Sequence, residues 1–495
     1  MQIDILKSKV KNFIESKWFI VLLSILTFLC WLTPIYLLST IFMMISLALI
    51  LWSGSNMVSI ISVYMLYFAG KSEFSMGSIK TPENITCISI ISILGLAAII
   101  FAILDIKKNF KIYKNKLLID KFFISTVAIL LYMAITIVNS PIVSYSIGST
   151  LKNVLIFFAF ILAELKIPKD DNTKDTLIFS LVLSIFVIFS EFCVRFIYVY
   201  NNYEHLLTAR SHMGTLYFDY VSLDEALSLK ELGLFWAVSN HYIIVVNMAL
   251  IASAYYIFTN KDNKKKILSA FAIVLALIMN YFDKCRAGYL ALLASFAAMA
   301  ILLIVRNKDK RTRIIIYSSV FSICVIAALA LVIIVTPEKI VDLFKKIGTN
   351  RSTLYSIAWA QFKEHITFGT GIGSSYYYLV RDLISKQTLY NYHNYILQIL
   401  STMGIIGFGL FLYHLSTIII KIWGYKSHNI MLIAILTYFL INGLFDSIFF
   451  EDPYMIWYFI LISVFCKTKN SDLNKIYYLY WCWRTLWRLV LTVDI

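Results

Sequence analysis

Residues 350–373 read NRSTLYSIAWAQFKEHITFGTGIG, and residues 393–407 read HNYILQILSTMGIIG. They belong to the one long polar interruption in the second half of a very apolar chain. From Arg351 to Gly407, this segment contains an arginine, a tryptophan, a glycine cluster and a histidine. Long polar segments in a compact membrane domain usually carry function. We therefore interpret this segment as the reaction chamber of the protein.

The composition of the chain is that of a membrane protein. Of its 495 residues, 60% are hydrophobic and 15% are charged, whereas soluble proteins contain about 25% charged residues. The mean hydropathy is +0.79. The formal net charge of +16 does not indicate nucleic-acid binding, because the lysines gather in short loops between apolar runs. This is the positive-inside pattern, and we expect an all-α polytopic membrane protein.

Successive apolar runs predict about 14 transmembrane helices, because one span needs roughly 20 apolar residues. The basic clusters between the runs place both termini on the cytoplasmic side. The run that begins at Trp18 has no small-residue cleavage site, so we expect a retained first span. The runs are 18–34, 36–52, 56–70, 85–105, 117–138, 147–165, 175–199, 239–259, 266–283, 287–305, 314–335, 392–420, 429–447 and 454–467.

Two long outward-facing loops and a tail that combines three tryptophans with two arginines divide the chain into four parts. These are an N-terminal transmembrane bundle (1–200), an outer loop (201–240), a core (241–470) that includes the second outer loop (336–392), and a cytoplasmic interfacial tail (471–495). Helical spacing of apolar residues after Arg351 predicts a short amphipathic helix in the second loop. The seven cysteines show no CxxC spacing, so we interpret them as packing residues.

Five of the ten arginines lie at or beyond the outer ends of helices, where the positive-inside pattern should deplete them. A guanidinium group binds phosphate oxygens through two parallel hydrogen bonds and remains charged, so these arginines suit a lipid-linked phosphate or diphosphate. Arg286 would add its charge to the positive end of a helix dipole. The alternative is that they are lipid headgroup anchors. The five are Arg195, Arg210, Arg286, Arg351 and Arg381.

His393 lies where the polar loop enters an apolar helix, and Asn394 follows it directly. A neutral imidazole can take a proton from a sugar hydroxyl, although a lone histidine here could simply be satisfied by hydrogen bonds. Gly371 and Gly373 permit positive φ and the close approach of a ligand, or alternatively a flexible turn. The chain has neither an HExxH nor an Asp-x-Asp motif, so we expect no metal and no cofactor, with arginine neutralising the phosphates instead.

Three segments resemble the superfamily of O-antigen ligases and Wzy-type O-antigen polymerases, which are bacterial envelope proteins. The most specific one combines the glycine cluster with residues 393–407, and the others are 284–292 and 350–359. The resemblance extends from about Asn240 to Phe411. Unlike many members, the chain has Cys285 where Ser or Thr is usual before the arginine, and Ile366 and Thr367 where a proline often precedes the glycines.

The resemblance implies a metal-independent glycosyltransferase of the inner bacterial membrane, with its active site on the periplasmic face. Arg286 and Arg351 would bind the diphosphate of an undecaprenyl-diphosphate-linked glycan, and His393 would be the catalytic base. We expect an O-antigen or surface-polysaccharide polymerase that joins lipid-linked repeat units, with a chain-length regulator as a further partner. A ligase with lipid A-core or another acceptor is the first alternative, and a lipid-linked glycan flippase is the second. Candidate substrate contacts are Arg195, Trp359, Gly371, Gly373 and Asn394.

Overall fold

The computed structural model describes most of the apolar runs and much of the second outer loop. Within the described part, the regular structure is helical and contains no strand. The described residues are 2–32, 36–55, 59, 62, 107, 120–167, 170–213, 239–283, 285–306, 337–382, 391–423, 429–445 and 452–466. The predicted spans at 85–105 and 314–335, most of the span at 56–70, and the tail at 471–495 lie outside these residues.

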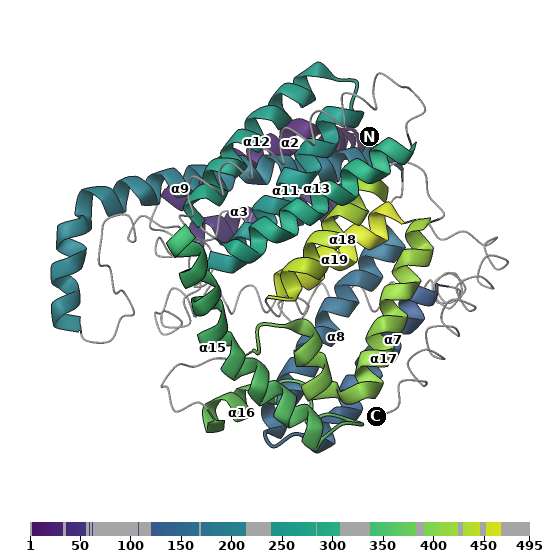
Figure 1. Ribbon diagram of the computed structural model, residues 1–495. Coiled ribbons are helices and arrows are strands. Elements are labelled where there is room, and N and C mark those ends of the chain that lie inside the picture. Colours follow the sequence, from purple (N-terminus) through teal and green to yellow (C-terminus); the bar gives the residue numbers. More distant parts are fainter. Residues whose placement is uncertain are drawn as a thin grey trace.

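One group of helices packs around α11 (Ser239–Thr259), whose residues from Ile243 to Tyr256 are almost all buried. α9 (Asp171–Met213), α12 (Asn263–Asp283), α13 (Arg286–Arg306) and α18 (Asn429–Gly443) surround it. In Figure 1 these helices lie together toward the top, except for the end of α9, which bends away at the left. α2 (Lys17–Leu32) packs against α9, and α1 (Gln2–Ile14) and α3 (Tyr36–Ser53) pack against α2. α11 is therefore the central helix of this group.

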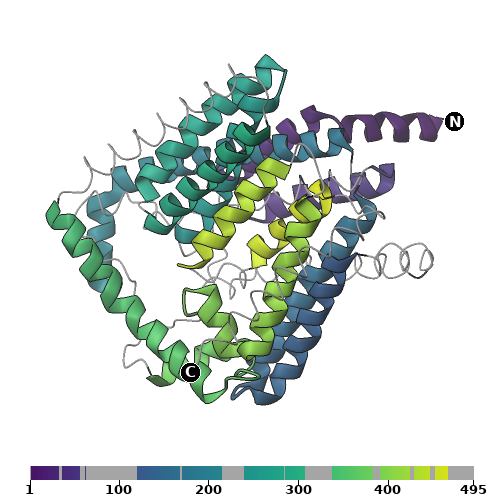
Figure 2. The same cartoon turned by 45° about the vertical axis from the view of Figure 1, so that its right-hand side comes forward.

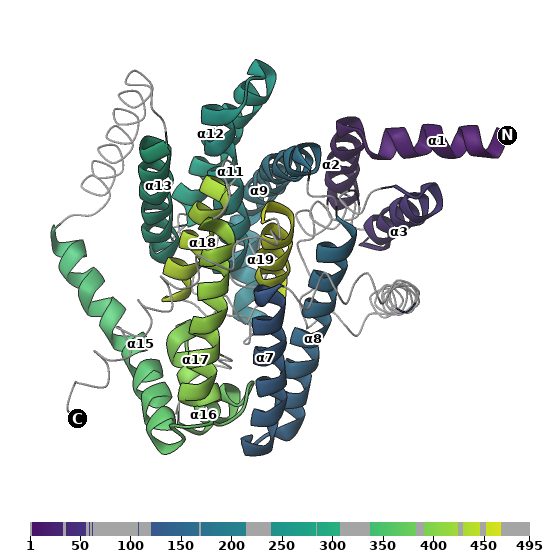
Figure 3. The ribbon, with the colours of Figure 1, turned by 90° about the vertical axis from the view of Figure 1, so that its right-hand side faces the viewer.

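A second group joins helices that are far apart in the sequence. α7 (Lys121–Thr136) packs along α17 (Tyr395–Trp423), and α8 (Val143–Lys166) packs against both α7 and α19 (Asp452–Phe465). Figures 1 and 3 show α7, α8 and α17 side by side. The short 3-10 helix η2 (Ile137–Asn139) connects α7 to α8.

The second outer loop contains two helices. α15 (Pro337–Glu364) is a long oblique helix at the edge of the molecule, and α16 (Ser375–Asp382) is a short helix near its end (Figure 2). The predicted amphipathic helix after Arg351 is thus confirmed, and it begins well before that residue. α9 likewise continues to Met213, so the described start of the first outer loop is helical.

Among the described residues, five helices are long and apolar enough to cross a membrane. They lie at 121–139, 171–190, 263–282, 286–303 and 395–422. A sixth candidate is the pair formed by 3–14 and 17–29, which is bent by 71°. The prediction of an all-helical, multi-span membrane protein is confirmed. The number of about 14 spans stays a prediction.

Candidate functional site

The inner face of α15 packs on the loop and helix that carry the predicted base. Leu354 and Ala358 are buried against Leu379 of α16 and Tyr392, directly before His393. Leu354 and Ala358 are four residues apart and therefore lie on one face of the helix. This small apolar cluster fixes how α15 lies against the start of α17, and with it the position of Arg351.

Arg351 and Asn394 bind neighbouring carbonyl groups at the end of α18. Arg351 Nη1 donates to the carbonyl oxygen of Phe445 at 2.7 Å, and Asn394 Nδ2 donates to that of Leu444 at 2.9 Å. Carbonyl groups at a helix C-terminus lack helical partners and carry partial negative charge, so they accept such donors readily. The end of α18 therefore brings the predicted phosphate-binding arginine to the predicted base. This bond uses one of the five N–H groups of the Arg351 guanidinium.

His393 is the only described non-glycine residue with a positive φ, at 53°. This left-handed conformation is uncommon outside glycine and tends to occur at functional sites. The turn is fixed on both sides, because Asn394 Oδ1 accepts from the backbone N–H of Leu397 at 3.0 Å, and the hydroxyl of Tyr355 donates to the carbonyl oxygen of His393 at 3.5 Å. Asn394 thus caps α17. His393 itself is half-buried.

The glycine cluster packs against backbone rather than opening onto space. Gly369, Gly371 and Gly373 all have positive φ, as predicted. The backbone N–H of Gly371 donates to the carbonyl oxygen of Thr402 at 2.8 Å, within α17. A Cβ added at Gly371 would lie 2.8 Å from the carbonyl oxygen of Thr136, and one at Gly373 would lie 2.6 Å from Ser149 Oγ. The close approach predicted for a ligand is therefore made here by α7, α8 and α17, and a role in substrate contact stays a prediction.

A buried polar network, which sequence analysis did not find, connects this glycine turn to α15. Gln361 donates to Thr370 Oγ1 and accepts from the hydroxyl of Tyr392. Gln398 Oε1 accepts from the backbone N–H of Tyr392 at 3.0 Å, and its Nε2 donates to Ser375 Oγ at 3.0 Å. These side chains are buried. Because unsatisfied buried amides are costly, the network fixes α15, the glycine turn and the start of α17 together.

Arg286 is the exposed first residue of α13. Cys285 takes the cap position before it, because its Sγ accepts from the backbone N–H of Gly288 at 3.4 Å. Serine or threonine at this position would cap the helix in the same way, so the unusual cysteine preserves the geometry. An arginine at a helix N-terminus adds positive charge where the helix dipole is already positive, which favours an anion nearby.

Two further predicted substrate contacts are Trp359 and Arg195. The side chain of Trp359 is 47% exposed and packs on Phe362, with ring centroids 5.2 Å apart. It lies on the outer side of α15, where lipid or an entering glycan can reach it. Arg195 lies in α9, and its side chain is outside the described part of the structure.

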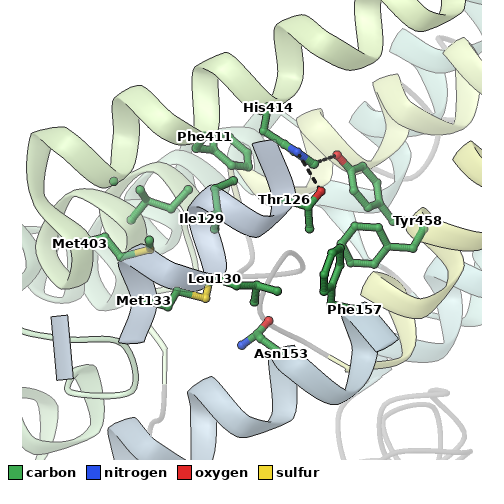
Figure 4. A pocket seen from close by; sticks show the side chains of 13 residues that line it. Thr126, Ile129, Leu130, Met133, Asn153, Phe157, Met403, Phe411, His414 and Tyr458 are labelled. Carbon is green, nitrogen blue, oxygen red and sulfur yellow. Dashed lines mark hydrogen bonds between the residues drawn. The ribbon is translucent and has the colours of Figure 1, made fainter. Parts of the chain in front are cut away.

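A cavity of about 50 Å³ lies between α7, α8, α17 and α19 (Figure 4). None of the predicted site residues lines it. Its polar wall contains His414, whose ring nitrogens are bonded to Ser125 Oγ at 2.9 Å and to the hydroxyl of Tyr458 at 2.7 Å. His414 is thus a histidine satisfied by hydrogen bonds inside the bundle.

Residues 271–412 match the family model described as O-antigen ligase. These residues are therefore similar to an O-antigen ligase domain. This confirms the resemblance to the superfamily of O-antigen ligases and polymerases, and the matched residues contain Arg286, Arg351 and His393. No curated protein matches the chain.

The matched residues include α13, α15, α16 and the first part of α17, whereas α18 follows them in the chain. The carbonyl groups that accept from Arg351 and Asn394 therefore come from beyond the matched residues. The match supports a membrane protein of O-antigen ligase or polymerase type that acts on lipid-linked glycans. Among the described residues, no group of three or more His, Cys, Asp or Glu side chains could hold a metal ion. Metal independence stays a prediction.

Proposed function

We propose that the protein is a glycan polymerase that transfers an undecaprenyl-diphosphate-linked glycan to a sugar hydroxyl of a second lipid-linked repeat unit. The observation that carries this proposal is the arrangement at the end of α18, where Arg351 and Asn394 bind adjacent carbonyl groups and the strained His393 lies next to Asn394. An ionic group for phosphate and a candidate base thus lie within one small region of the residues that match the O-antigen ligase family.

In the proposed reaction, His393 takes the proton of the acceptor hydroxyl as its oxygen attacks the anomeric carbon of the donor glycan. The bond from that carbon to the diphosphate oxygen breaks, and undecaprenyl diphosphate leaves with the bonding electrons. Arg286 and Arg351 stabilise the negative charge that develops on the leaving diphosphate, which preorganised donors do most effectively in a site with little water. The proton on His393 later passes to solvent.

A ligase that uses lipid A-core or another acceptor is the second candidate, and the family description favours it. The chemistry at the donor is the same in both cases, because only the acceptor that supplies the hydroxyl differs. The region around Arg351 and His393 therefore does not distinguish them.

The deciding experiment uses purified full-length protein in detergent with one lipid-linked repeat unit and no other acceptor. A polymerase gives a ladder of products on a gel, and His393→Ala removes it. His365→Ala is the matched control, because His365 is exposed just beyond the end of α15 and should leave the ladder unchanged. A ladder that persists in His393→Ala would refute the assignment of the base. Folded protein that makes product only with an added lipid A-core acceptor would instead be a ligase.

A further inference from the structure

Four buried polar side chains form a hydrogen-bond network between α11, α12 and α18. Asn247 Nδ2 donates to the hydroxyl of Tyr438 at 3.0 Å, and Asn280 Nδ2 donates to Asn247 Oδ1 at 2.8 Å. Asn442 Nδ2 donates to the same Tyr438 hydroxyl at 3.4 Å. All four side chains are at most 3% exposed. We define them as the α18 network.

Polar side chains at helix interfaces in a membrane commonly hold helices together, and this is the simpler explanation of the network. Its two ends, however, lie at the predicted site. At one end, the hydroxyl of Tyr289 donates to the carbonyl oxygen of Asn280, and a Cβ on Gly288 would lie 3.5 Å from Asn247 Nδ2. Gly288 and Tyr289 are in the first turn of α13, directly after Arg286.

The other end of the network lies at the end of α18. The main-chain carbonyl oxygen of Asn442 accepts from the backbone N–H of Phe445 at 2.9 Å. Phe445 and its neighbour Leu444 supply the carbonyl groups that Arg351 and Asn394 bind. A continuous series of contacts thus leads from the helix start that carries Arg286 to the carbonyl groups that hold Arg351 and the turn at His393. Figure 3 shows α13, α18, α17 and α15 in the left half of the view.

We infer that Tyr438, with the asparagines bonded to it, is a positioning residue that fixes the separation between Arg286 and the pair Arg351 and His393. The inference rests on the proposed function, because it takes these residues as the clamp and the base. Two arginines bind one diphosphate productively only if their spacing is held closely, since displacements of about 1 Å can lower a rate by about 10²-fold. Tyr438 has the central place, because its hydroxyl accepts from two asparagines on two helices.

The test replaces Tyr438 with Phe, which removes the hydroxyl and keeps the ring. We expect kcat for glycan transfer to fall about tenfold with KM nearly unchanged, because the donor still binds but its diphosphate is no longer held for the transition state. Tyr458→Phe is the matched control. This substitution also removes one buried hydroxyl, which is bonded to His414 Nε2 at 2.7 Å. The Tyr458 hydroxyl belongs to the cavity between α7, α8, α17 and α19 and not to the α18 network.

A double-mutant cycle separates positioning from general stabilisation. If Tyr438 acts through Arg286, the Tyr438→Phe change should cost much less in a protein that already carries Arg286→Lys. Tyr438→Phe added to a protein that carries Tyr458→Phe should show no such coupling. Asn442→Ser is the second network variant, used if Tyr438→Phe does not yield folded protein.

The possible outcomes distinguish this inference from the proposed function. If wild-type protein transfers glycan and the two tyrosine variants have equal kcat, or if the effects of Tyr438→Phe and Arg286→Lys simply multiply, the positioning role is overturned and the enzyme remains. If folded wild-type protein transfers glycan to neither a second repeat unit nor lipid A-core, the proposed function is overturned and this inference with it. A selective, non-multiplicative loss of kcat in Tyr438→Phe supports both.

Discussion

At the scale of single residues, the contact between Arg351 and Phe445 has two explanations. Arg351 could simply satisfy a carbonyl group at the end of α18, or it could bind phosphate with the rest of its guanidinium group. A lysine at position 351 could still satisfy the carbonyl group, but it could not bind phosphate in the same way. Its ammonium group donates to a carbonyl oxygen, but it has no planar fork for two phosphate oxygens.

We expect Arg351→Lys to fold with nearly wild-type thermal stability and to transfer glycan about 10²-fold more slowly, the loss typical when one preorganised donor is removed. The measurement is kcat/KM with lipid-linked repeat units, together with the unfolding temperature in detergent. Lys363→Arg is the control, since Lys363 is exposed in the last turn of the same helix. Transfer at the wild-type rate by Arg351→Lys would leave only the capping role.

The candidate residues were proposed from the sequence and stay a prediction, whereas their local geometry could not be predicted from it. Arg286, Arg351 and His393 were found because an arginine or histidine at an outer helix end contradicts the usual distribution of charge. The positive φ of His393 and the Phe445 carbonyl that accepts from Arg351 depend on contacts between distant segments. Cys285 was read as a departure from the family, and only the structure shows that its sulfur caps α13.

At the scale of elements, α17 is interrupted where the glycine turn crosses it. Gly404 has φ of 65° within the helix, and the backbone N–H of Ile405 donates to the carbonyl oxygen of Ile366 at 2.8 Å. A Cβ on Gly404 would clash with the carbonyl group of Thr367. The sequence predicted glycines with positive φ, but it could not indicate that α17 itself would occupy the space they leave.

We expect Gly404→Ala to destabilise the protein by at least about 2 kcal/mol, because a left-handed conformation and a backbone clash act together. Gly409→Ala is the matched control on the same helix, since a Cβ at Gly409 meets no atom within 4 Å. That control should be neutral or slightly stabilising, as alanine favours a helix more than glycine does. Unfolding temperatures of the two variants in detergent provide the measurement, and equal values would contradict the proposed packing role.

At the scale of the whole molecule, the site depends on several helix ends meeting on one side. α12 and α18 end there, whereas α13 and α17 begin there. Hydropathy and basic clusters predicted these boundaries to within a few residues, because apolar length and loop charge decide them. Which helices become neighbours was not predictable, since α7 and α17 pair across more than half of the chain with no local signal.

We expect the α15 side of the protein to face outward and the turn between α11 and α12 to face the cytoplasm. In a variant whose seven cysteines are replaced, Thr353→Cys on α15 and Lys264→Cys at the start of α12 each supply one exposed thiol. A membrane-impermeant maleimide should label position 353 in intact spheroplasts and position 264 only after lysis, because the lysine-rich turn stays inside. Labelling of both positions in detergent serves as the accessibility control. The reverse pattern in spheroplasts would place Arg351 and His393 on the cytoplasmic side, where a polymerase of the proposed type could not meet its exported substrate.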